Sequence, residues 1–248
     1  MAALLDHPLV SERYFFPRRA TPPGAVEVEV EGATLVCAAH RPHPGAPTLV
    51  YFHGNGEVVA DYVPDYAEAF ASVGLNTFFA EYRGYGGSTG TPALVRMLDD
   101  VAPLLDAVGV PDDELVIYGR SVGSIYAVEA ASRRPNVLAL LLESGVCSPL
   151  GRVLLRVTPQ ELGTTIDALR EEAAERLDHA KKLGTYPGPV LVMHAERDDL
   201  VRVDEARANA SWAKRSELLL FSRGDHNSIH GYNLPAMLEA VARVAGTR

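Results

Sequence analysis

The chain has 248 residues, of which 47% are hydrophobic and 22% are charged, and its 23 basic and 32 acidic residues give a formal net charge of −9. This composition excludes an intrinsically disordered chain, which combines low hydrophobicity with high net charge. The acidic balance argues against nucleic acid or an anionic membrane surface as a partner, because both are bound through basic faces. We therefore expect a globular protein that acts on a small molecule or an acyl compound. Its oligomeric state is not predicted.

The cysteines and the longest apolar runs indicate a cellular location. Cys37 and Cys147 are the two cysteines, too few and too far apart for a disulfide framework or a cysteine zinc site. The first ten residues contain Asp6 and Pro8 and have no basic segment, unlike a secretory signal. Apolar runs such as 137–142 fall well short of the ~20 residues that a membrane helix needs. These features predict a cytoplasmic protein without stable membrane insertion.

The first predicted element is an antiparallel hairpin. Valine and glutamate alternate over residues 26–30, which is the period of a half-buried strand, and Gly32 marks a turn. Residues 33–38 can then return as the second strand. Six short, mostly apolar runs follow, at 48–52, 77–80, 115–118, 137–142, 190–193 and 218–221. Strands that are apolar throughout are buried on both faces, which is typical of a parallel sheet covered by helices.

Helical patterns separate these runs, at about 57–73, 92–108, 122–134, 204–214 and 233–245. The alternation predicts a doubly wound α/β fold, with a mainly parallel twisted sheet, helices on both faces and the hairpin at one edge. We expect residues 1–248 to form a single domain. The interval 145–189 contains no strand pattern but includes one amphipathic helix at about 159–182. It is predicted to be a short helical cap over a pocket or a crossover that packs on the sheet.

The sharpest local signal lies in residues 115–123, where an apolar strand runs into the sequence GRSVG and then into a helix. This is the setting of a nucleophile elbow, in which a serine sits on a tight turn above the sheet. Glycines on either side allow the strand and the helix to approach closely. Ser121 is therefore the candidate nucleophile. The alternative is that Ser121 only caps the helix that follows.

A serine nucleophile needs an adjacent general base, and a carboxylate that orients the base. In α/β-hydrolases these residues follow in the order serine, acid, histidine. Among the histidines after Ser121, His179 lies in the helical insertion and His194 at the end of a strand. His226 lies in a loop after the last predicted strand, from which it can reach back over the sheet. We favour His226 as the base over His230, which can also be a pocket wall or a surface residue.

Several carboxylates compete for the role of the acid. Asp198 and Asp199 both follow the strand 190–193, and a carboxylate beyond a strand end can hold the far nitrogen of the histidine. Neighbouring side chains point in different directions, so one of the two is expected to reach it. Glu196 is a weaker candidate. Glu143, at the end of the preceding strand, is either a rival acid or a buried carboxylate paired with an arginine or with backbone amides.

Developing negative charge on a substrate requires an oxyanion hole made of backbone N–H groups. Val122 follows the nucleophile and opens a helix, so its N–H is the first predicted donor. The glycine-rich loop after strand 48–52 offers the second. We assign it to Asn55, with Gly56 as the alternative, and expect His53 to organise this loop.

Taken together, the motifs resemble the α/β-hydrolase superfamily, and most closely its Bem-type branch of α/β-hydrolase-domain serine hydrolases. The resemblance implies Ser121 as nucleophile, Asp198 as acid and His226 as base, and it favours Asp198 over Asp199. Ala195 departs from the family, which usually has glycine there. The motifs are HGNG at 53–56, EYRGYGGS at 81–88, YGRSVG at 118–123, HxxxDxxV at 194–201 and GDHN at 224–227.

These residues predict a serine hydrolase that cleaves a carboxylic ester, a thioester or a related acyl bond through an acyl-enzyme. The reaction requires no metal and no organic cofactor. The alternatives are a non-catalytic binding protein on a hydrolase fold, or a peptidase or acyltransferase with the same triad. An apolar acyl channel can be built from the 145–185 segment and four tyrosines, which otherwise pack in the core. The tyrosines are Tyr62, Tyr66, Tyr82 and Tyr85.

Overall fold

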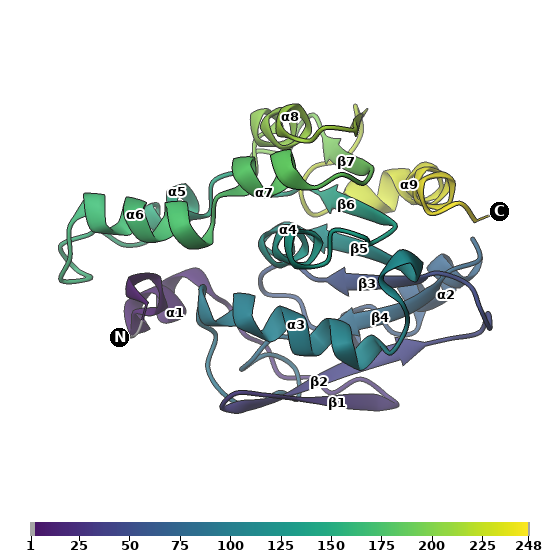
Figure 1. Ribbon diagram of the computed structural model, residues 1–248, viewed down its shortest axis with the longest axis horizontal. Helices are drawn as coiled ribbons and strands as arrows, with labels where there is room; N and C mark the ends of the chain where they lie inside the picture. Colours follow the sequence, from purple (N-terminus) through teal and green to yellow (C-terminus); the bar gives the residue numbers. More distant parts are fainter. Residues whose placement is uncertain (1–2, 248) are drawn as a thin grey trace.

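One eight-stranded sheet, of strand order β1-β2-β4-β3-β5-β6-β7-β8, runs through the computed structural model, which describes residues 3–247 (Figure 1). β1 and β2 form an antiparallel hairpin, β2 is antiparallel to β4, and the remaining pairs are parallel. The predicted fold class is therefore confirmed, with the hairpin at one edge. The strands are β1 (Ala25–Val30), β2 (Ala33–His40), β3 (Thr48–Phe52), β4 (Asn76–Ala80), β5 (Leu115–Arg120), β6 (Ala139–Glu143), β7 (Val190–Ala195) and β8 (Ser216–Phe221).

Helices cover both faces of the sheet (Figure 1). The α-helices are α1 (Pro8–Tyr14), α2 (Asp65–Ala71), α3 (Arg96–Val108), α4 (Gly123–Arg133), α5 (Pro149–Leu154), α6 (Ile166–Arg176), α7 (His179–Thr185), α8 (Val203–Trp212) and α9 (Ile229–Ala245). Short 3-10 helices lie at Leu4–Asp6, Val59–Asp61 and Asp112–Glu114. Within residues 3–247, every helix is too short or too polar to span a bilayer.

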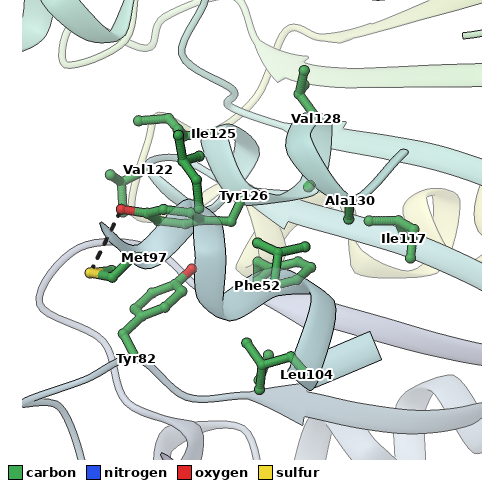
Figure 2. Packing of buried hydrophobic residues seen from close by; sticks show 14 of the residues in the cluster. Phe52, Tyr82, Met97, Leu104, Ile117, Val122, Ile125, Tyr126, Val128 and Ala130 are labelled. Carbon is green, nitrogen blue, oxygen red and sulfur yellow. Dashed lines mark hydrogen bonds between the residues drawn. The ribbon is translucent and has the colours of Figure 1, made fainter. Parts of the chain in front are cut away.

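Two apolar layers hold the helices on the sheet. On one face, Phe52 of β3 and Ile117 of β5 belong to the same buried cluster as Ile125 and Tyr126 of α4 (Figure 2). The opposite layer contains residues of α2 and α9 together with Tyr51 of β3. Full burial of a large apolar side chain contributes about 1.5–3 kcal/mol. This packing fixes the β5–α4 junction, where the candidate nucleophile lies.

The predicted helix over 57–73 is too long. A 3-10 turn occupies Val59–Asp61, and α2 begins only at Asp65. Pro64 explains the break, because the residue before a proline is disfavoured in the helical conformation. The predicted helices at 92–108, 122–134, 204–214 and 233–245 correspond to α3, α4, α8 and α9.

The prediction of one helix over 159–182 is wrong. The chain forms α6 and α7 in this region, preceded by α5. Thr165 caps α6 by accepting a hydrogen bond from the N–H of Ala168, and Asp178 caps α7 by accepting one from the N–H of Lys181. A side-chain cap of this kind starts a new helix, a feature that apolar periodicity does not reveal. α7 packs against α4 and α8, whereas α5 and α6 extend away from the sheet (Figure 1).

The N-terminal segment is attached to this extension. The N–H groups of Leu4 and Leu5 donate to the Glu172 carboxylate of α6 at 2.8 and 2.7 Å. Asp6 accepts hydrogen bonds from the N–H groups of Val95 and Arg96 at the start of α3. The sequence pattern did not predict α1. Its C-terminal end and the residues that follow reach the candidate site.

Candidate active site

Ser121 lies in the turn between β5 and α4 with a φ of 51°, a left-handed conformation that residues other than glycine rarely adopt. The flanking glycines are required by close packing. A Cβ atom on Gly123 would lie 2.1 Å from the carbonyl oxygen of Phe52, and one on Gly119 would lie 2.6 Å from Cβ of Ala127. This close approach of strand, turn and helix holds the Ser121 side chain above the sheet, as the elbow pattern predicts.

Ser121, His226 and Asp198 form one chain of hydrogen bonds, although they are far apart in the sequence. Nε2 of His226 lies 3.0 Å from Oγ of Ser121, and its Nδ1 lies 2.7 Å from Oδ2 of Asp198. The other carboxylate oxygen of Asp198 accepts hydrogen bonds from the N–H groups of Leu200 and Val201. All three side chains are buried. This geometry allows a proton to pass from the serine hydroxyl to an imidazole that a carboxylate holds in place.

The charge on Asp198 follows from its contacts. Burial disfavours the ionised form, but the hydrogen bond with His226 and that with the Val201 N–H outweigh burial and lower the pKa of Asp198. The carboxylate is therefore ionised at neutral pH. It accepts the Nδ1 proton of His226 and leaves Nε2 as the acceptor that faces Ser121.

The rival acid and base lie in other surroundings. Asp199 lines the same cavity as Ser121 but forms no hydrogen bond with His226 among residues 3–247.

The rival base, His230, has other partners. Its Nε2 lies 2.7 Å from Oε2 of Glu143, and its Nδ1 lies 2.5 Å from the Tyr66 hydroxyl. His230 thus belongs to a network around Glu143 that does not include the side chains of Ser121, His226 and Asp198. The structure brings Asp198, and neither Asp199 nor Glu143, to His226.

Arg120, which precedes the serine, is the centre of that network and was not predicted to have a role. Its guanidinium donates to Glu57 at 2.9 Å, to Glu143 at 2.8 Å and to the backbone carbonyl of His226 at 3.0 Å. Burial opposes ionisation of Glu143, but His230 and Arg120 lower its pKa to about 2. Glu143 is thus the buried carboxylate paired with an arginine that the sequence offered as an alternative to an acid role.

Glu143→Gln is expected to act mainly on stability. It leaves the Arg120 guanidinium buried beside a neutral amide, and breaking a buried ion pair costs roughly 3–5 kcal/mol of unfolding free energy. Because the folded pKa is about 2 and the ordinary value is 4.5, the stabilisation is complete above pH 4.5 and is lost as the pH falls toward 2. Urea unfolding of both proteins at several pH values measures this. Equal stability at pH 7 would contradict the assigned role.

The predicted oxyanion donors lie beside Ser121. Val122 and Asn55 line the same cavity as the serine, and neither N–H donates a backbone hydrogen bond within residues 3–247. Within the described residues, neither N–H is therefore engaged by another backbone group. Gly56, the alternative donor, does not line this cavity.

The side chain of Asn55 fixes its own loop. Its Nδ2 donates to the carbonyl of Tyr14 at 2.5 Å, and its Oδ1 accepts from the N–H of Phe16 at 2.9 Å and from the Tyr85 hydroxyl at 2.7 Å. His53, earlier in the loop, pairs with Glu81 at 2.6 Å. That contact confirms the predicted organising role of His53.

The cavity around Ser121 has a volume of about 550 Å³. Tyr14 and Phe16 of the N-terminal segment contribute to its wall, as do residues within 152–156, at the end of α5 and beyond it, and the loop after β7. The tyrosines at 62, 66, 82 and 85 do not line it, so they form no channel at Ser121. The alternative of core packing holds for Tyr62, Tyr82 and Tyr85, which are buried. Residues 3–247 hold no group of three or more His, Cys, Asp or Glu side chains placed to bind a metal ion.

Curated proteins align with much of this chain. The chain is 27% identical to alpha/beta hydrolase domain-containing protein 17C of Xenopus laevis over 207 residues, 81% of this chain and 63% of that protein. It is 26% identical to protein bem46 of Schizosaccharomyces pombe over 159 residues, 62% of this chain and 52% of that protein. The chain thus spans less than two thirds of the length of these relatives.

Solved structures of hydrolases share the fold. Est1E from Butyrivibrio proteoclasticus with bound ferulic acid has a TM-score of 0.72 at 20% identity and covers 88% of this chain and 97% of its own. The esterase RhEst1 from Rhodococcus sp. has a TM-score of 0.70 at 16% identity, with 90% and 98% covered. The family model described as Hydrolase_4, serine aminopeptidase, S33, matches residues 43–177. The chain therefore belongs to this serine hydrolase family of the α/β-hydrolase fold, on its Bem-type branch.

Proposed function

We propose that the protein is a serine hydrolase that cleaves a carboxylic ester or a thioester through an acyl-enzyme. The observation that carries the proposal is the hydrogen-bonded chain from Ser121 through His226 to Asp198, with the serine at the wall of a 550 Å³ cavity. A binding protein has no need for a strained serine joined to an oriented imidazole. Such a triad is the arrangement that makes a serine hydroxyl nucleophilic.

In the first half of the reaction, Oγ of Ser121 attacks the acyl carbonyl while Nε2 of His226 takes the hydroxyl proton. The negative charge that develops on the carbonyl oxygen is stabilised by the N–H groups of Val122 and Asn55. Asp198 stabilises the imidazolium that forms. The tetrahedral intermediate then collapses, and His226 gives its proton to the departing alcohol or thiol.

In the second half, water attacks the acyl group on Ser121, and Nε2 of His226 takes a proton from that water. The same two N–H groups hold the oxyanion again. Collapse of the second intermediate breaks the bond to Oγ, and the proton on His226 returns to the serine. The carboxylic acid leaves and the free enzyme is restored.

In this proposal, different parts of the segment 145–189 act as a cap over the cavity and as a crossover that packs on the helices of the sheet. Val146, Arg152 of α5, and Leu155 and Arg156 directly after it line the cavity, which supports a role as a short cap. α7 instead packs against α4 and α8, as a crossover does. The single domain over residues 1–248 remains our interpretation, with the cap as part of it.

A fluorophosphonate probe tests the proposed nucleophile without knowledge of the substrate. We expect the probe to label Ser121, and labelling to disappear in Ser121→Ala and after heat unfolding. Labelling that is absent from the folded protein, or that persists in Ser121→Ala, would contradict the assignment.

The reaction class is tested by turnover of 4-nitrophenyl esters from acetyl to palmitoyl, acyl thioesters and aminoacyl 4-nitroanilides. We expect the esters and thioesters to be cleaved. The family description names an aminopeptidase, so cleavage of the anilides alone would replace the ester proposal with a peptidase.

A further inference from the structure

The mouth of the cavity carries exposed apolar side chains. The large apolar residues that are exposed in residues 3–247 are Leu4, Phe16, Leu155, Leu200 and Tyr232. Three of these five line the Ser121 cavity, namely Phe16 at 48%, Leu155 at 71% and Leu200 at 46% exposure. Single exposed apolar residues are ordinary, but their concentration around one cavity indicates a surface that an apolar ligand covers.

Two arginines line the same cavity. Arg152 belongs to α5, and Arg156 lies four residues further on, just after the helix ends at Leu154. The guanidinium of Arg156 forms no ion pair within residues 3–247, and its central carbon lies 5.9 Å from the centre of the Phe16 ring. The carboxylate nearest to Arg152 is Glu205, at 3.7 Å, which also accepts the N–H of Cys147. Within residues 3–247, the positive charge of Arg156 is therefore not paired with a carboxylate.

Within residues 3–247, neither acidic residue of the cavity forms an ion pair with Arg152 or Arg156. Glu57 is fully occupied, because its carboxylate accepts from Arg120 at 2.9 Å and from the Gly54 N–H and the Tyr62 hydroxyl at 2.5 Å each. Asp199 has no ion pair within residues 3–247. It follows β7, whereas the two arginines come from the α5 segment. The cavity is thus lined by two guanidinium groups and two carboxylates, and the two arginines come from a different segment than either carboxylate.

We propose that Arg152 and Arg156 form a subsite for a carboxylate or phosphate group of the substrate. A guanidinium offers a planar set of donors that matches either group. Resting on the proposed hydrolase function, the inference names the substrate class as an acyl ester or thioester that has both an apolar part and an anionic group. The apolar part lies against Phe16, Leu155 and Leu200.

The test compares substrates that differ in one charge. The first pair is mono-4-nitrophenyl adipate and its methyl ester, in which the charge lies on the acyl part. The second pair is 4-butyryloxybenzoate and its methyl ester, in which the charge lies on the leaving group. The quantity measured is the ratio of kcat/KM for the anionic substrate to that for its methyl ester.

We expect this ratio to fall roughly fivefold in Arg156→Gln and in Arg152→Gln, which corresponds to about 1 kcal/mol per charge pair. The pair of substrates that responds identifies the side of the ester that carries the charge. Asp199→Asn, which removes a negative charge from the same cavity, is expected to raise the ratio. Arg170→Gln is the matched control, because Arg170 is 67% exposed on α6 and outside the cavity.

Three results would overturn the subsite. In the first, the ratios for both substrate pairs stay at the wild-type value in Arg152→Gln and in Arg156→Gln. In the second, the neutral methyl esters lose as much kcat/KM as the anionic substrates. In the third, Arg170→Gln lowers the ratio as much as the cavity variants do. Each leaves hydrolysis by the wild type intact, so the proposed function stands. Failure of the wild type to cleave any ester, together with absent fluorophosphonate labelling, overturns the function and the subsite together.

Discussion

Ser121→Ala is expected to lower kcat for ester hydrolysis by about 10⁴-fold or more while the protein stays folded. The hydroxyl that His226 Nε2 faces at 3.0 Å is the only atom removed. His226→Ala is expected to cause a similar loss, and the double variant to be little worse than either, because members of a triad act as a unit. The measurements are single-turnover rates and melting temperatures of the three variants.

The contrast between two histidines provides the control for this experiment. His230 contacts Glu143 and not Ser121, so His230→Ala should cost much less activity than His226→Ala. Losses that add in the double variant would place His226 outside the triad. A Ser121→Ala protein that keeps a tenth of wild-type turnover would show that another group is the nucleophile.

Asp198→Asn is expected to lower turnover by roughly 10²–10⁴-fold, since a comparable change in another triad costs about 10⁴. The amide keeps the shape of the side chain but loses the charge that fixes the Nδ1 proton of His226 at 2.7 Å. Asp199→Asn is the matched control, one residue away and on the same cavity, and should cost far less.

Turnover and melting temperature together decide between the acids. We expect Asp198→Asn to have strongly reduced turnover but to stay folded, and Glu143→Gln to be mainly less stable. Near wild-type activity in Asp198→Asn, combined with loss of activity in folded Asp199→Asn or Glu143→Gln, would show that another carboxylate orients His226. The assignments of Ser121 and His226 could still stand in that case.

The sheet could be predicted from the sequence because strands that are buried on both faces consist of short runs of mostly apolar residues. The run at 48–52 is mostly apolar and forms β3 with the same bounds, and all five of its residues are buried. The elbow could also be predicted, because close packing leaves space only for glycine at positions 119 and 123, where a Cβ would make contacts as close as 2.1 Å. Glycines fixed in this way are visible in the sequence. These features depend on residues that are neighbours in the chain, or on burial alone.

Features that depend on distant contacts were harder to predict. Asp198 and Asp199 follow the same strand, and the residue pattern alone did not separate them, whereas the family resemblance favoured Asp198. The role of Arg120 depends on Glu57, Glu143 and the carbonyl of His226, which lie on three different elements. Its signal is an arginine at the end of a mostly apolar strand, directly before the serine. The break between α6 and α7 was missed because a single aspartate cap, and not a loss of periodicity, defines it.

Trapping of the acyl group is the most direct test of the central claim that Ser121 forms a covalent intermediate. Wild-type protein is mixed with excess 4-nitrophenyl butyrate, quenched in acid during turnover and analysed by intact and peptide mass spectrometry. The account predicts one added butyryl group, located on Ser121, and none in Ser121→Ala. Steady hydrolysis by the wild type with the butyryl group on another residue, or with Ser121→Ala equally active, would contradict it.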